Sequence, residues 1–197
     1  MFSAVAARLL GLRARYAEPH RAYHGQAHVD ALLAGLDALG PAVHAPATAE
    51  LAVWYHDAVY DPARSDNEAR SAALLRSEMA GLADPAALTA AALIVEATAS
   101  HHLPPGLDTA AWEDCALVLD LDMAVLGASA AEYDAYEQGI AAEYVPVHGT
   151  ATFRAGRAAF LRRTLERPAL FYTDRFRRAL DARARDNMRR ALATLEL

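Results

Sequence analysis

The sequence predicts an all-α protein, a compact bundle of about nine helices that forms a single domain over residues 1–197. Apolar residues recur at three- and four-residue intervals along most of the chain, which is the spacing of one helix face. No convincing run alternates between apolar and polar residues with the period of a strand. Prolines, glycines and capping residues divide the pattern into helices over residues 2–16, 24–39, 47–60, 66–81, 85–100, 109–127, 130–144, 150–166 and 173–195.

Apolar spacing marks the first four of these helices. The first carries its apolar residues at Phe2, Val5, Leu9 and Leu12. The second contains the run HGQAHVDALLAGL, and the third contains the almost wholly apolar LAVWYHDAVY. The fourth begins NEARSAALL, and Asp66 directly before it can cap its start.

The later helices are recognised by their starts and by the breaks between them. Asp84 stands before Pro85, which places a capping carboxylate ahead of a proline in the first helical turn. Ser129 and Glu132 have the spacing of a capping box. The chain is expected to break at Glu18–Pro19, Gly40–Pro41, Asp61–Pro62, Pro104–Gly106, Pro146 and Pro168.

The composition argues against several functional classes. Hydrophobic residues make up 54% of the chain, as in a globular protein, and the net charge of −6 gives no electrostatic footprint for nucleic acid. No apolar run reaches the roughly 18–20 residues that span a bilayer. The chain has no GxGxxG or GxxxxGK[ST] motif, which argues against dinucleotide-binding and P-loop enzymes.

Two features bear on the cellular compartment. Cys115 is the single cysteine, which rules out an internal disulfide and fits a reducing compartment, and we expect it to be a buried small residue rather than a nucleophile. The segment before Glu18 contains arginines and no acids, as in a weak transit peptide, but its helical spacing favours an amphipathic helix. We therefore expect a cytoplasmic protein with no membrane partner, and the sequence leaves its oligomeric state open.

Ionisable residues interrupt three apolar stretches. His56 and Asp57 lie in LAVWYHDAVY, and Asp120 and Asp122 lie in ALVLDLDMAVL, while His24 and His28 open the second helix. Burying an ionised carboxylate without a partner costs several kcal/mol, so such groups are normally paired or bound to a metal. The pattern predicts one metal site built from three helices.

The spacing of these residues leaves alternatives open. His56 can also be a buried histidine that hydrogen-bonds the backbone, with Asp57 as its ion-pair partner. His24 and His28 share a helix face and can bind zinc jointly, but we favour His28 as the ligand and His24 as a supporting or substrate-facing residue. Asp120 and Asp122 face different sides of their helix, so spacing does not choose between them.

His101 and His102 are further candidates for the pocket because they end a helix just before the Pro104–Gly106 turn. The alternative is that both are exposed histidines, which the helix dipole favours at a C-terminus.

Taken in order, His28, His56–Asp57 and Asp122 resemble the HD-domain superfamily of metal-dependent phosphohydrolases. Longer stretches are similar to predicted bacterial phosphohydrolases of that superfamily with a YHxxxH…HDAVYD…NExxSA layout: RAYHGQAHV, LAVWYHDAVYDPARSDNEARSA, VEATASHH and LVLDLDMAVLGA. The resemblance covers most of residues 16–196.

The resemblance implies that His28, His56, Asp57 and Asp122 ligate one divalent cation. It favours Asp122 over Asp120 because the last ligand of the superfamily is usually the second acid of such a D-x-D pattern. Many members have another histidine shortly after the dyad for a second metal, whereas this chain reads DNEARS there, so we expect a mononuclear site. Imidazole and carboxylate ligands together suit Mn, Fe, Co, Ni or Zn better than Mg or Ca.

The expected activity is hydrolysis of a phosphate ester by metal-activated water, as in a phosphomonoesterase or phosphodiesterase. The substrate would be a nucleotide or another small phosphorylated metabolite. Asp57 is the expected ligand and candidate base, and Glu68 is a weaker candidate for proton transfer. Four residues are candidates for substrate binding, although most surface arginines are simply solvated: Arg21, His24, Arg70 and His101.

Two other functional classes stay open at this point. Some relatives use two irons for oxygen chemistry, and this would need further ligands from Glu68, His101 or His102. The chain can also be a non-catalytic regulatory module that binds a metal or a nucleotide.

Overall fold

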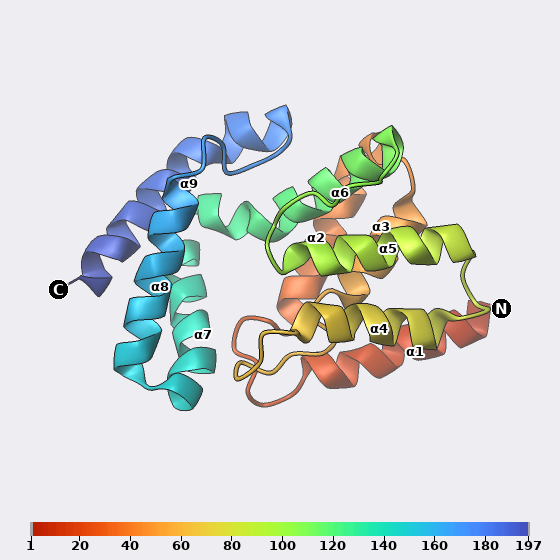
Figure 1. Ribbon diagram of the computed structural model, residues 1–197, viewed down its shortest axis with the longest axis horizontal. Coiled ribbons are helices and arrows are strands. Elements are labelled where there is room, and N and C mark those ends of the chain that lie inside the picture. Colours follow the sequence, from red (N-terminus) through yellow and green to blue (C-terminus); the bar gives the residue numbers. More distant parts are fainter. Residues whose placement is uncertain (1, 197) are drawn as a thin grey trace. The chain divides into compact units, whose positions relative to one another are not determined.

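The computed structural model describes residues 2–196 of the chain, and side chains from residue 7 onward. Within this range the protein is all-helical and has no strand, which confirms the predicted fold class (Figure 1). The described residues form nine α-helices and two short 3-10 helices. These are α1 Phe2–Tyr16, α2 Gln26–Leu39, η1 Gly40–Ala42, α3 Pro46–Tyr55, α4 Asn67–Met79, α5 Pro85–Thr98, α6 Thr109–Asp122, η2 Met123–Gly127, α7 Ala130–His148, α8 Thr150–Leu165 and α9 Asp174–Leu195.

Each predicted helix corresponds to one of these helices, but several ends differ. Helix α3 stops at Tyr55 rather than at residue 60. The segment predicted to extend α6 to residue 127 is instead the tighter η2. The predicted break at Pro146 is wrong, because α7 continues through this proline to His148. Proline removes one N–H donor, and so close to the helix end this costs a single backbone hydrogen bond.

Carboxylates and one hydroxyl satisfy the backbone N–H groups at several helix starts. The Asp84 cap of α5 and the Ser129–Glu132 capping box of α7 are both present, as predicted. The cap predicted for Asp66 is wrong, because its carboxylate oxygens accept instead from the Arg64 guanidinium, both at 2.6 Å. The chain just before α3 is held by Asp114, a buried carboxylate on α6 that accepts from the backbone N–H groups of His44 and Ala45, each at 2.7 Å.

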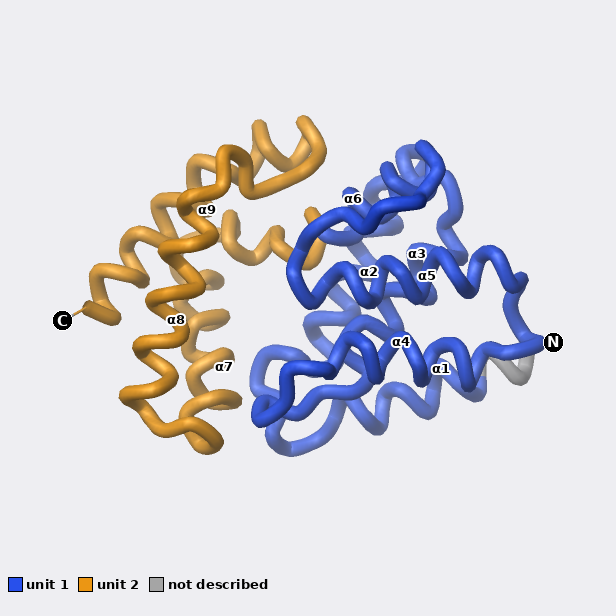
Figure 2. The backbone as a smooth tube through the Cα atoms, in the orientation of Figure 1, with its two compact units in different colours: residues 1–119 blue, residues 120–197 orange. Residues whose placement is uncertain are grey.

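The chain divides into two compact units, residues 1–119 and residues 120–197, which Figure 2 distinguishes by colour. In the first unit, α5 packs against both α3 and α4, and α2 packs against α3. In the second unit, α9 packs against η2 and α8. The buried core of the second unit includes Met123, Leu126, Tyr133, Leu161, Phe171 and Met188. The prediction of a single domain over residues 1–197 stays a prediction.

Two expectations from composition are met in the described part of the chain. Cys115 is fully buried, as predicted, and burial raises the pKa of its thiol to about 12. Such a thiol carries almost no thiolate near neutral pH and is a poor nucleophile. No helix in the described range combines the length and the apolar character that a membrane crossing requires.

Gly127 provides a stability test of the second unit. A Cβ atom at this position would lie 2.6 Å from Leu180 Cβ and 2.9 Å from the Leu180 carbonyl oxygen, so α9 packs directly on the glycine. Gly127→Ala is expected to lower the free energy of unfolding by about 1–3 kcal/mol, as overpacking does. Urea denaturation measures this loss. The matched control is Gly156→Ala, at an exposed position of α8 where nothing lies within 4 Å of the added Cβ and the better helix former should be neutral or stabilising. Equal stability of Gly127→Ala and wild type would contradict this close packing.

Candidate metal centre

The dyad His56–Asp57 stands where α3 ends, not inside a helix as predicted. The last carbonyl groups of α3 are bonded by groups other than the next helical turn. The Trp54 carbonyl accepts from the Tyr16 hydroxyl at 2.9 Å, and the Tyr55 carbonyl accepts from the Ala58 N–H at 3.1 Å. Because these partners replace continued helical bonds, the chain turns out of the helix at His56.

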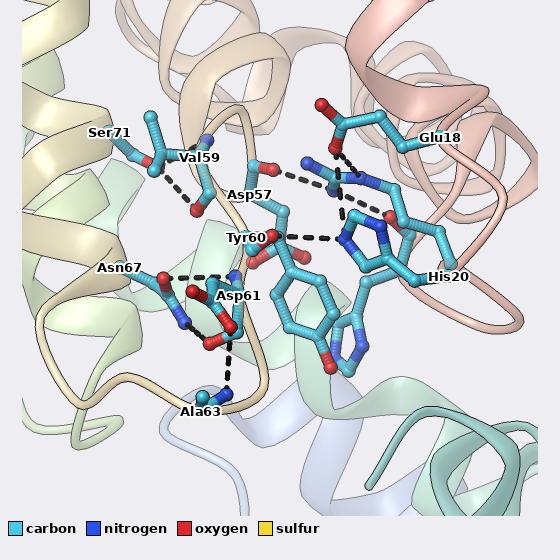
Figure 3. Close-up of polar contacts among 11 residues, drawn as sticks. Glu18, His20, Asp57, Val59, Tyr60, Asp61, Ala63, Asn67 and Ser71 are labelled. Atoms are coloured by element: carbon cyan, nitrogen blue, oxygen red, sulfur yellow. Dashed lines mark hydrogen bonds and ion pairs between the residues drawn. The ribbon is translucent and has the colours of Figure 1, made fainter. Parts of the chain in front are cut away.

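The segment after the dyad is held by the first turns of α4 (Figure 3). The Ser71 hydroxyl accepts from the Val59 N–H at 3.0 Å, and Asn67 accepts from the Asp61 N–H at 3.1 Å and donates to the Asp61 carbonyl at 2.9 Å. Asn67 and Ser71 are both buried. These side chains take the place of backbone partners and give the irregular segment a defined course.

Three ionisable side chains of the first unit meet at this point. His28 on α2 and His56 are buried, and their Nε2 atoms lie 3.1 Å apart. Asp57 Oδ2 lies 3.0 Å from His56 Nε2 and 3.9 Å from His28 Nε2. The structure thus brings together three of the four predicted metal ligands.

The Asp57 carboxyl stays ionised in spite of its burial. Burial by itself would raise its pKa, but the imidazoles of His56, His24 and His28, which favour an ionised Asp57 when they are protonated, and the contact with His56 outweigh this effect. The pKa of Asp57 is therefore held well below its usual range. An ionised carboxylate is the form that binds a cation.

The donor set fits a divalent cation. His56 Nδ1 lies 2.7 Å from the Val53 carbonyl oxygen, which assigns the ring proton of a neutral His56 to Nδ1. The Nε2 lone pair of His56 then faces the Asp57 carboxylate oxygen, and two acceptors at 3.0 Å repel each other. A proton on Nε2 removes this repulsion, and a cation held by His56 and Asp57 would remove it as well. A backbone carbonyl on the second ring nitrogen is also the usual support of a metal-bound histidine.

His24 lies beside these residues but precedes α2, because the helix begins at Gln26 rather than at residue 24. Its ring centroid is 4.5 Å from that of Tyr60 and 6.1 Å from that of His28. His24 and His28 are thus neighbours, although they do not both lie on one helix. His20, in the loop between α1 and α2, has its Nε2 3.1 Å from the Tyr60 carbonyl oxygen.

Glu68 interacts electrostatically with Asp57, His24 and His101. Burial raises the pKa of Glu68 and the Asp57 charge adds to the rise, while the positive charges of His101 and His24 oppose it. Glu68 is half-buried in the first turn of α4. His101 follows α5 with a left-handed φ of 52°, a conformation common just past a helix C-terminus but costly for a residue with a side chain. His102 is exposed.

The two predicted phosphate-binding arginines lie in different surroundings. The Arg21 side chain has no exposed area, and its Nη1 donates to the carbonyl oxygens of His24 and Asp57. Arg70 is exposed on α4, where its charge adds to the lowering of the Asp66 pKa that the hydrogen bond from Arg64 causes. Their roles in phosphate binding stay predictions.

In the second unit, Asp120 is bound to the backbone before α9. Its carboxylate accepts from the N–H groups of Tyr172 and Thr173, at 2.7 and 2.8 Å, and from the Thr173 hydroxyl at 2.7 Å. Asp120 is fully buried, and burial raises the pKa of its carboxyl against the lowering effect of these bonds. Both carboxylate oxygens are therefore committed to protein donors. Asp122 is the half-buried last residue of α6, and its charge adds to the rise that burial causes in the pKa of Tyr136.

Four residues that were not predicted from the sequence also shape the first-unit site: Tyr16, Tyr60, Asn67 and Ser71. Tyr16 continues the apolar spacing of α1 from Leu12 and reads as an ordinary core residue. Asn67 and Ser71 fall within the NEARSA stretch, whose polar character suits an exposed helix start. Their hydrogen-bond partners are backbone groups, and the pattern of side chains in the sequence does not indicate which backbone groups are bound.

Comparisons with known proteins return no match among protein-family models, curated proteins or solved structures. The resemblance to the HD-domain superfamily therefore rests on the motifs of the chain itself.

Proposed function

We propose that this protein is an HD-domain-like, metal-dependent phosphohydrolase with one divalent cation. The observation that carries the proposal is the meeting of His28 Nε2, His56 Nε2 and Asp57 Oδ2, in which two histidine nitrogens and an ionised carboxylate converge within a buried part of the first unit. Mixed nitrogen and oxygen donors favour Mn, Co, Fe, Ni or Zn over Mg.

We propose Asp122 as the fourth ligand for two reasons. One is its place in the HD-like order of motifs, and the other is that Asp120 is already hydrogen-bonded. Asp120 already accepts three hydrogen bonds within the second unit, so it has little left to offer a cation. Of the two acids in the D-x-D pattern, Asp122 is the one that the HD-like order selects.

The cation, when bound, lowers the pKa of coordinated water and polarises a phosphoryl oxygen. The surrounding residues supply the rest of the chemistry. The Val53 carbonyl keeps the proton of neutral His56 on Nδ1 and directs Nε2 toward Asp57. Glu68 has a raised pKa, so it holds a proton more readily than an exposed glutamate and can exchange one with a departing oxygen.

The substrate would be a nucleotide or another small phosphorylated metabolite. His24 and His101 add positive charge near Glu68, which favours an anionic substrate on this side of the dyad. Arg70 lies one helical turn after the start of α4. Because its side chain is exposed, it is available to bind a phosphate oxygen.

The direct test measures phosphate release from a panel of nucleotides and phosphoesters. Chelator-treated protein is assayed alone and after addition of Mn²⁺, Co²⁺ or Mg²⁺. We expect turnover only with added metal, and more with Mn²⁺ or Co²⁺ than with Mg²⁺. Bound metal without turnover on any substrate would contradict a hydrolase and favour a regulatory module, and two irons per chain would favour oxygen chemistry.

A further inference from the structure

Arg21 is enclosed next to the proposed metal centre. Its guanidinium carbon lies 5.1 Å from the ring centroid of Tyr16 and 5.2 Å from that of Tyr60, and the side chain has no exposed area. Nε donates to Glu18 Oε2 at 3.0 Å. Figure 3 shows the segment from Glu18 to His20 facing Asp57 and Tyr60.

One nitrogen of Arg21 connects the two segments that carry the ligands. Nη1 donates to the His24 carbonyl oxygen and to the Asp57 carbonyl oxygen, both at 2.8 Å. His24 leads directly into α2, which carries His28, and Asp57 is itself a ligand in the proposed site. Arg21 is therefore a direct link between the two backbones, and it lies beside the contact of His20 Nε2 with the Tyr60 carbonyl oxygen.

We propose that Arg21 is a positioning residue that sets the affinity of the metal site by fixing the Asp57 backbone against the start of α2. This inference rests on the proposed function. In this role Arg21 contacts backbone carbonyl oxygens of the protein rather than the phosphate of a substrate.

The cost of burying this arginine supports a positioning role. Nη2 is buried and has no hydrogen-bond partner among the described residues, and such a group reduces stability. Buried charges can often be replaced by apolar residues with no loss of stability. What the guanidinium provides here, and an apolar side chain does not, is a planar donor held between two rings and aimed at two carbonyl oxygens.

The test is a titration of chelator-treated protein with Co²⁺, followed by visible absorption of the bound ion. Arg21→Lys keeps the charge but replaces the planar fork with a flexible point charge. We expect its Co²⁺ dissociation constant to rise about 10- to 100-fold, the range seen when residues that support metal ligands are changed. The matched control is Arg13→Lys, because Arg13 is exposed on α1 and also stacks on an aromatic ring, that of Trp54, at 5.6 Å.

Melting of the metal-free variants separates positioning from general damage. The proposal expects Co²⁺ affinity to fall in Arg21→Lys and to be unchanged in Arg13→Lys, with metal-free Arg21→Lys still melting cooperatively. If Arg21→Lys does not fold, Glu18→Gln decides, since the Glu18 carboxylate is partly exposed, accepts from Nε of Arg21 and otherwise lies 3.8 Å from His20 Nε2. Weaker Co²⁺ binding by that variant supports the proposal.

Unchanged Co²⁺ affinity in folded Arg21→Lys, or in Glu18→Gln when the first variant does not fold, overturns the positioning role. Failure of wild type to bind Co²⁺ overturns the proposed metal centre instead. Because the measurement needs no substrate, its result is independent of whether the bound metal supports phosphate release.

Discussion

Replacement of Asp57 by alanine is expected to remove the metal and abolish phosphate release while the helical content stays close to that of wild type. Asp57 is a carboxylate that meets both His28 and His56, and its low pKa keeps it charged. Without it, the two imidazoles lose the negative charge that balances a cation. We expect metal affinity to fall by at least about 100-fold, the upper end of losses seen for residues that only support ligands.

Metal content by elemental analysis and far-ultraviolet circular dichroism measure these two outcomes separately. The carboxylate control is Asp186→Ala, because Asp186 is exposed and its ion pair with Arg189 lies on the surface. The histidine controls are His44→Ala and His148→Ala, both exposed positions. Full metal occupancy in Asp57→Ala would show that the dyad is not the site, and marked metal loss in either histidine variant would place the site elsewhere.

Asp120→Ala is expected to destabilise the protein strongly without removing the metal from the folded fraction. The buried Asp120 carboxylate accepts from the Tyr172 N–H, the Thr173 N–H and the Thr173 hydroxyl. Alanine leaves these three donors without their acceptor. We expect the free energy of unfolding to fall by about 2–4 kcal/mol. Urea denaturation followed by circular dichroism measures this loss.

The companion variant Asp122→Ala is expected to behave in the opposite way. As the proposed fourth ligand, Asp122 contributes to metal binding, and its half-buried place at the end of α6 makes a large stability loss unexpected. Metal content should therefore fall in Asp122→Ala and be retained in folded Asp120→Ala. The reverse pattern would assign the ligand role to Asp120 and refute the choice made from the D-x-D motif.

Most helices of this protein follow from local sequence. Asp84 and the Ser129–Glu132 pair act on N–H groups two or three residues away, so a short window contains both the cap and its target. The apolar spacing that marks each helix is likewise local. The end of α3 is different. It depends on Tyr16, whose hydroxyl bonds a carbonyl 38 residues later, and no pattern within LAVWYHDAVY contains that partner.

The candidate site divides in the same way. The sequence by itself identified His28, His56 and Asp57, because ionisable groups within apolar stretches need a partner wherever the chain places them. Only the tertiary structure decided how the neighbouring groups are used. Asp120 is bound by donors 52 and 53 residues away, and the guanidinium of Arg21 is bonded to a carbonyl 36 residues away. These three partners are backbone atoms, which every residue possesses, so the sequence carries no signal of which ones are bound.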